Sequence, residues 1–238
     1  MFERKKYKSF AKKQLAGRWS IPVFITVIVS IVSLIFSRIQ SVQIKNSGYM
    51  DAALAGDIDS IMLSWQTMAF PMFSSSFIEM IVMSVFSIAT IGVYLKMSRS
   101  PEPVHFGDFV EGFNNWARAI LGTLWQALWV FLWSLLLFIP GIIKSIAYSQ
   151  MFYLIVEYKE LSVTKAMKIS MKITNGHKWD LFVMHLSFLG WLILSVFTLG
   201  ILDLWLVPYM NMTYVNAYHT LLKEAIENGV IKPEDLSE

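Results

Sequence analysis

Cysteine is absent from the 238-residue sequence, which excludes disulfide bonds, thiolate metal ligands and a thiol nucleophile. Charged residues are scarce as well, at 16% of the chain, whereas soluble domains carry about 25%. The chain also lacks an H-E-x-x-H metal motif, a glycine-rich phosphate loop and a G-x-S-x-G nucleophile elbow. These absences predict that the protein is not an enzyme and that it uses no cofactor or metal.

Apolar residues make up 55% of the sequence and gather in long runs without charge. The run between Arg18 and Arg38 has 19 residues, close to the ~20 that cross a bilayer as a helix. Such runs predict an all-α fold, a polytopic transmembrane helical bundle of six spans paired as three hairpins. The expected spans are residues 20–36, 77–95, 119–138, 141–157, 181–197 and 201–222.

Two interruptions of the apolar runs shape this threading. Residues 60–78 are free of charge but contain Pro71 and three consecutive serines, which are typical of breaks. We therefore expect residues 61–70 to be an interfacial or re-entrant segment on the outer side. Ile139-Pro140-Gly141 predicts a very tight turn, because proline cannot continue a helix and glycine tolerates the reversal. Thr198-Leu199-Gly200 predicts a second such turn.

The basic residues indicate the orientation of the chain. With the N-terminus inside, 17 Lys and Arg residues fall in inner segments and three fall in outer ones, at Arg38, Lys45 and Lys144. Cytoplasmic segments of membrane proteins carry an excess of Lys and Arg. The sequence therefore predicts a multi-pass protein of the cytoplasmic membrane with both termini in the cytoplasm.

Two basic segments are predicted to form amphipathic helices at the cytoplasmic surface, one before the first span and one between Glu160 and Lys178. A helix with a basic face and an apolar face suits a membrane surface rich in anionic lipids. Nucleic-acid binding is the less favoured alternative, because basic clusters beside spans are ordinary topology signals. The chain thus divides into a basic N-terminal helix, a membrane domain and a polar cytoplasmic tail, at residues 1–19, 20–222 and 223–238.

The later hairpins share a pattern that suggests an internal repeat. Aligning Gly141 with Gly200 also pairs identical residues, Phe138 with Phe197, Ile142 with Ile201 and Met151 with Met210. Each predicted hairpin follows a short segment that ends near a tryptophan, L-A-G-R-W, F-N-N-W or N-G-H-K-W. Three parallel units of surface helix plus hairpin explain this pattern, and chance similarity between apolar sequences is the alternative.

Polar side chains inside the predicted spans form the candidate site. Lys144 and Asp203 each follow a turn glycine by three residues, so both lie ~5 Å from the outer turn and can form an ion pair, joined by Glu79. An ionisable group within a span is by default a functional hypothesis. The alternative is that all three carry their charges to the headgroups or hold helices together.

Further polar residues lie deeper. His185 can relay protons or hydrogen-bond a neighbouring helix. A polar stripe in the last span, which includes Asn216, can line an aqueous path or hold helices together. The complete candidate site comprises Glu79, Lys144, Gln150, His185, Asp203, Asn211 and Asn216.

The motif F-I-P-G-I-I-K-S-I-A-Y-S at residues 138–149 resembles bacterial integral membrane proteins grouped as domain of unknown function 975. Similar motifs are L-A-G-R-W, A-M-K-I-S-M-K-I-T-N-G-H-K, L-S-F-L-G-W, T-L-G-I-L and L-V-P-Y. Asp203 stands where the family is expected to have a small or apolar residue. The resemblance implies six spans and a bacterial cytoplasmic membrane, and it brings no activity, substrate or catalytic residue.

These observations together favour a non-catalytic membrane component that engages lipids or a membrane partner, which can be a protein or a peptide. The surface helices and the missing catalytic motifs support this function. A small solute or peptide transporter or channel is the alternative, because the polar stripe and the charges near the span ends could line a path.

Overall fold

The computed structural model describes residues 2–236 and every side chain among them except that of Phe138. These residues form helices and connecting loops without a strand, which confirms the predicted all-α class. The α-helices are α1 (Arg4–Leu15), α2 (Ser20–Asn46), α3 (Tyr49–Ala55), α4 (Ile58–Arg99), α5 (Phe106–Gly112), α6 (Trp116–Leu136), α7 (Phe138–Tyr148), α8 (Met151–Glu157), α9 (Val163–Ile173), α10 (Lys178–Phe197) and α11 (Asp203–Glu227). Two 3-10 turns, η1 (Phe113–Asn115) and η2 (Pro233–Leu236), complete the described chain.

Five helical segments of the described chain are long and apolar enough to cross a membrane, where the sequence predicted six. They are Ser20–Asn46, Ile58–Arg99, Phe106–Leu136, Ile139–Glu157 and Lys178–Phe197. The predicted sixth span lies in α11, which carries many polar residues and is not among the five. Eleven of its 25 residues are buried by other parts of the protein. The helix therefore needs less apolar surface of its own than the other five.

The chain divides into two compact units, and the smaller one comprises Val27–Met83. It contains the later part of α2, the short helix α3 and the first part of α4. The predicted separation of residues 61–70 from the span that follows is wrong, because α4 is one continuous helix of 42 residues that passes through Pro71. The serine cluster does not break the helix, since Ser74 and Ser75 donate their hydroxyls to carbonyls three residues back in α4.

The length of α4 has a simple consequence. At 1.5 Å per residue its 42 residues extend for ~63 Å, about twice the thickness of the hydrocarbon core of a bilayer. One helix of this length reaches well beyond a single bilayer core. The smaller unit also holds a polar ladder between its two long helices, in which Gln40 donates to Glu79 at 2.9 Å and Ser75 donates to Gln43 at 3.1 Å.

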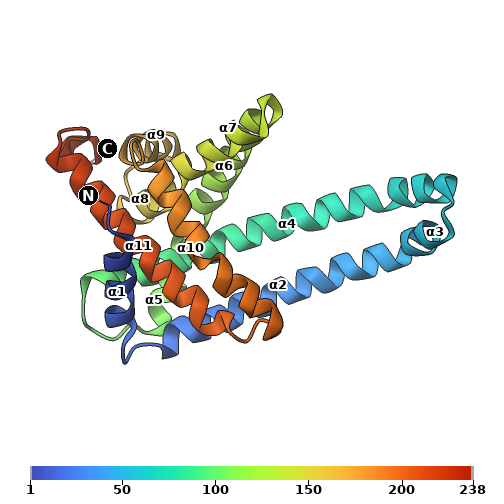
Figure 1. The fold of residues 1–238 in the computed structure, drawn as a ribbon, viewed down its shortest axis with the longest axis horizontal. Helices are drawn as coiled ribbons and strands as arrows, with labels where there is room; N and C mark the ends of the chain where they lie inside the picture. The colour runs from blue at the N-terminus through green and yellow to red at the C-terminus, as the bar shows by residue number, and fades with distance from the viewer. Residues whose placement is uncertain (1, 237–238) are drawn as a thin grey trace. The chain divides into compact units, whose positions relative to one another are not determined.

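In the larger unit, the N-terminal helix packs along α11 (Figure 1). The predicted apolar face of this helix is confirmed in part, because Tyr7, Ala11 and Leu15 are buried. Gln14 of α1 accepts a hydrogen bond from Asn216 of α11 at 2.8 Å. The apolar face expected on the membrane surface is thus covered by the protein, since α11 offers a polar and apolar surface that matches it.

A testable consequence concerns Lys8, which also points toward the bundle. Its ammonium lies 3.9 Å from the ring centroid of Phe188, and burial, with the charges of Arg4 and Lys12, lowers the pKa of Lys8. The unfolded chain then binds more protons between the two pKa values, so stability rises with pH in that window, up to about 10.4. We expect Lys8→Met to remove this rise in unfolding temperature measured from pH 8 to 10.5, and Lys13→Met, on the exposed face, to retain it. Identical profiles for wild type and Lys8→Met would contradict the assignment.

The turn between α6 and α7 lies earlier than predicted. The chain reverses at Leu137, which is extended (φ −161°, ψ 146°), and Ile139-Pro140-Gly141 belong to the first turns of α7. Proline is tolerated there because the first N–H groups of a helix have no intrahelical partner. Gly141 is needed for close contact, since a Cβ at this position would lie 2.2 Å from the hydroxyl oxygen of Ser134 on α6. Helices α6 and α7 accordingly lie side by side (Figure 1).

The span predicted at residues 141–157 is not one regular helix, because it is interrupted between α7 and α8 at Ser149–Gln150. Helix α9 packs against this break. Its Ser170 donates to the carbonyl of Ala147 at 2.7 Å and accepts the N–H of Gln150 at 3.1 Å. Ser162 caps α9, and the apolar face of α9 is buried in the protein. The break is therefore supplied with hydrogen bonds by a helix that the sequence placed on the membrane surface.

The turn at residues 198–200 is confirmed. Leu199 has a φ of 51° and Gly200 a φ of 82°, and the Gly200 N–H donates to the Ser195 carbonyl at 2.9 Å. After the turn, α11 continues into the predicted tail as far as Glu227, and Leu236 is buried. The remaining tail residues, 237 and 238, and residue 1 of the predicted N-terminal helix lie outside the described residues.

Candidate functional site

Each of the three charged residues predicted to meet near the outer turns has its own contacts in the structure. Glu79 accepts a hydrogen bond from Gln40, and one carboxylate oxygen of Asp203 is buried without a hydrogen-bond partner. The ion pairs of the described chain do not join Lys144 to Asp203. Instead, the ammonium of Lys144 lies 4.5 Å from the ring centroid of Trp133. The predicted ion pair between Lys144 and Asp203 is therefore not formed, and Glu79 belongs to the other compact unit of the chain.

Lys144 lines a cavity of about 220 Å³ between α6, α7 and α9. We call it the tryptophan–lysine cavity. A second lysine, the exposed Lys168 on α9, lines the same cavity. Its complete lining is Trp125, Trp129, Trp133, Lys144, Tyr148, Thr164, Met167, Lys168 and Met171. Lys144 and Lys168 thus share one mostly apolar cavity, although the predicted threading placed Lys144 on the outer side of the membrane and Lys168 on the cytoplasmic side.

Helical spacing explains how these side chains meet. The three tryptophans are four residues apart along α6, so they share one face of the helix. Lys144 and Tyr148 are likewise one turn apart on α7 and face the same space. The rings of Trp125 and Trp129 contact each other edge to face, with centroids 5.8 Å apart. Sequence spacing alone therefore builds each wall, whereas the pairing of the walls depends on the tertiary fold.

The remaining predicted residues take part in helix packing. His185 contacts the Leu181 carbonyl of its own helix at 2.7 Å and stacks on Tyr214 of α11, with ring centroids 4.7 Å apart. Asn216 is buried and hydrogen-bonded to Gln14. Asn211 lies beside the buried hydroxyl of Tyr94 on α4. The structure brings none of these three side chains into the tryptophan–lysine cavity.

Gln150 occupies the break between α7 and α8 and is 4% exposed. Its side-chain nitrogen donates to Ser149 at 2.7 Å, while its side-chain oxygen is buried without a partner among the described residues. Within the described chain, no three histidine or carboxylate side chains gather as metal ligands would. The polar groups around Gln150 therefore serve the backbone of the broken helix.

Part of the chain is similar to one known protein family. A model of the family described as "Protein of unknown function (DUF975)" matches residues 135–225. The match covers 91 of the 238 residues and shows a similarity to this family over that region. This match confirms the resemblance predicted from the sequence motifs. No curated protein and no solved structure matches the chain.

The matched region holds most of the elements just described. It includes Lys144, the broken helix at Gln150, and Lys168 on α9, and it ends within α11. The tryptophans of α6 precede it at residues 125, 129 and 133. The tryptophan–lysine cavity is therefore built from the matched region and the helix immediately before it.

Sequence reasoning missed a charged network at the other end of the larger unit. Glu157, at the end of α8, pairs with Arg99 at the end of α4 and accepts the hydroxyl of Tyr218 on α11 at 2.6 Å. His219 contacts Ser98 at 2.8 Å beside it. The signal available in the sequence was only that Arg99 and Glu157 each end an apolar run. Nothing in that pattern indicates that they are partners.

Proposed function

We propose that the protein is a six-span, non-catalytic component of the bacterial cytoplasmic membrane that engages lipids, with both termini in the cytoplasm. The observation that carries the proposal is the use of its polar groups. Asn216 and the backbone of Gln150 are hydrogen-bonded to neighbouring helices, α1 and α9, rather than turned toward an aqueous path. Long apolar helices with such internal polar contacts suit a protein whose outer surface meets lipid.

The burial of α11 supports its role as the sixth span. Thr213, Asn216 and Tyr218 are buried against other helices, so the polar side of α11 is turned away from lipid. A polar residue inside a membrane helix is tolerated when it faces the bundle interior. Low hydropathy of α11 is then compatible with a membrane position.

Two arginines support the arrangement in repeated units. Arg18, just before α2, donates to carbonyls at the end of α4, and Arg118, early in α6, donates to carbonyls at and beyond the end of α8. Each arginine thus joins the start of one long helix to the end of the helix that returns. A parallel repeat predicts this correspondence for the first two units.

Cysteine labelling tests the proposal, and the absence of native cysteine makes it clean. We expect Asn211→Cys, Asn216→Cys and Gln150→Cys to react with a polar thiol reagent on the order of tenfold more slowly than Asn175→Cys. Asn175 is the control, because it lies in the exposed loop after α9. The measurement is the labelling rate in proteoliposomes. Labelling of these three positions at the rate of Asn175 would overturn the proposal and favour a transporter or channel.

A further inference from the structure

We propose that the tryptophan–lysine cavity binds the phosphate headgroup of an anionic phospholipid. The proposal rests on the lipid engagement proposed above and names the site and the class of lipid. It depends on three features of the cavity, which are its unpaired charges, its aromatic wall and the apolar surface beside it.

The two ammonium groups lack an anionic partner. Neither Lys144 nor Lys168 forms an ion pair with a carboxylate of the described chain, and no Asp or Glu lines the cavity. A charge held beside apolar helices is costly unless an opposite charge or hydrogen bonds compensate it. A bound phosphate supplies both. Because the lining carries two positive charges and no negative one, it favours an anionic headgroup over a zwitterionic one.

The aromatic wall suits the same ligand. Tryptophan gathers at the headgroup level of membranes because its ring is amphipathic and its indole N–H can donate a hydrogen bond. Trp133 already holds the ammonium of Lys144 over its face, so the amine stays directed into the cavity. A phosphate that enters therefore meets a positioned cation rather than a freely moving side chain.

Apolar surface for the acyl chains lies next to the cavity. Leu128 and Leu132 lie on α6, the helix that carries the tryptophans, and are 48% and 42% exposed. Ile142 and Ile143 of α7 are also exposed, but they line a separate hollow with α10 and not this cavity. A free phosphate would use only the two lysines, whereas a phospholipid also covers Leu128 and Leu132. The combination favours the lipid.

Native mass spectrometry of the full chain in mild detergent tests the proposal, with phosphatidylglycerol and phosphatidylcholine of equal acyl chains as probes. We expect the wild type to retain one phosphatidylglycerol at about tenfold lower lipid concentration than phosphatidylcholine. Lys144→Gln and Lys168→Gln should each weaken this preference, and the double variant should abolish it. Lys172→Gln, which removes an exposed charge one turn along α9, and Lys144→Arg, which keeps the charge, should retain it.

The outcomes separate this proposal from the one on which it rests. Phosphatidylglycerol retained equally by wild type and a monodisperse double variant would overturn the cavity assignment but leave lipid engagement standing. Retention of neither lipid by the wild type would overturn both. Displacement of the bound species by millimolar inorganic phosphate, with no gain from acyl chains, would overturn the lipid and assign the cavity to free phosphate.

Discussion

Replacing Gly112 by alanine is expected to lower the free energy of unfolding by about 3 kcal/mol. Gly112 ends α5 where that helix meets α4, and a Cβ at this position would lie 2.5 Å from the Cα of Ala89. Backbone cannot yield as the end of a side chain can, so α5 must move away from α4. That movement would disturb the ring contacts of Phe109 with Phe86 and Phe113.

Gly107 provides a matched control within the same helix. A Cβ at Gly107 would meet nothing within 4 Å, so Gly107→Ala changes helix propensity without a clash. The measurement is the unfolding temperature in detergent, which should fall by roughly 5–10 °C for Gly112→Ala and by much less, or not at all, for Gly107→Ala. Equal unfolding temperatures for the two variants would show that α5 and α4 are not in close contact.

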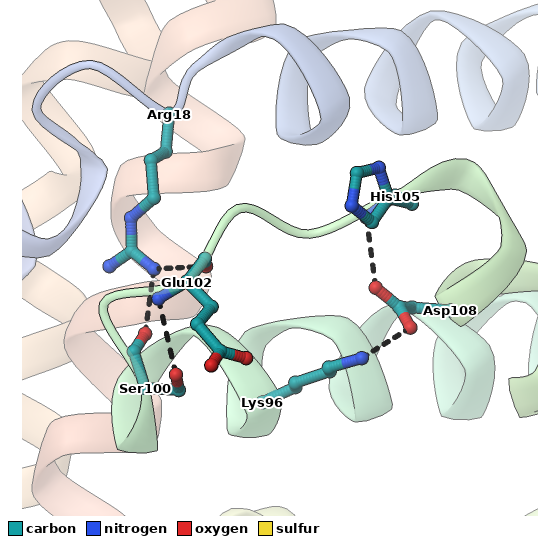
Figure 2. Close-up of polar contacts among 6 residues, drawn as sticks. All are labelled: Arg18, Lys96, Ser100, Glu102, His105 and Asp108. Carbon is teal, nitrogen blue, oxygen red and sulfur yellow. Dashed lines mark hydrogen bonds and ion pairs between the residues drawn. The ribbon is translucent and has the colours of Figure 1, made fainter.

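Removing the guanidinium of Arg18 is expected to cost about 2 kcal/mol of stability. The side chain donates to the carbonyls of Met97, Ser100 and Glu102, at 3.2, 2.8 and 3.1 Å, and so caps the C-terminal end of α4. Figure 2 shows the guanidinium between the last two of these residues. Carbonyls at the end of a helix have no intrahelical partner, and Arg18→Ala would leave them to water.

Lysine should not replace this arginine. A single ammonium cannot reach carbonyls spread over a loop as the planar, five-donor guanidinium does, so Arg18→Lys should lose most of the same stability. Lys13→Ala is the control, because Lys13 is an exposed basic residue of the same N-terminal segment. Thermal unfolding in detergent again provides the measurement. Full stability of Arg18→Lys would show that charge alone, and not the geometry of the donors, holds the end of α4.

The loop beyond α4 shows why such contacts escape sequence reasoning. Lys96 pairs with Asp108 at 2.5 Å, and Asp108 also accepts the N–H of His105, which fixes the start of α5 (Figure 2). In the sequence, nothing marks Lys96 and Asp108 as partners. Their pairing depends on a loop that turns back onto α4, and periodicity carries no information about loop paths.

The sequence by itself determined the helical class, the apolar segments and the resemblance to DUF975. These properties depend on local composition and on spacing of 3.6 residues per turn, both of which can be counted along the chain. The Thr198-Leu199-Gly200 turn and the Ser162 cap were predictable for the same reason, since each uses the chemistry of a few adjacent residues.

Only the tertiary structure decided where polar and basic residues make their contacts. The serines of α4 bond to their own helix, Pro140 begins α7 instead of ending α6, and Lys144 faces Trp133 and not Asp203. Helices α1 and α9 turn their apolar faces into the protein because α11 and the α7–α8 break offer partners there. Long-range pairing of this kind follows from which surfaces fit together, and a helix face with two suitable environments does not reveal in its own sequence which one it meets.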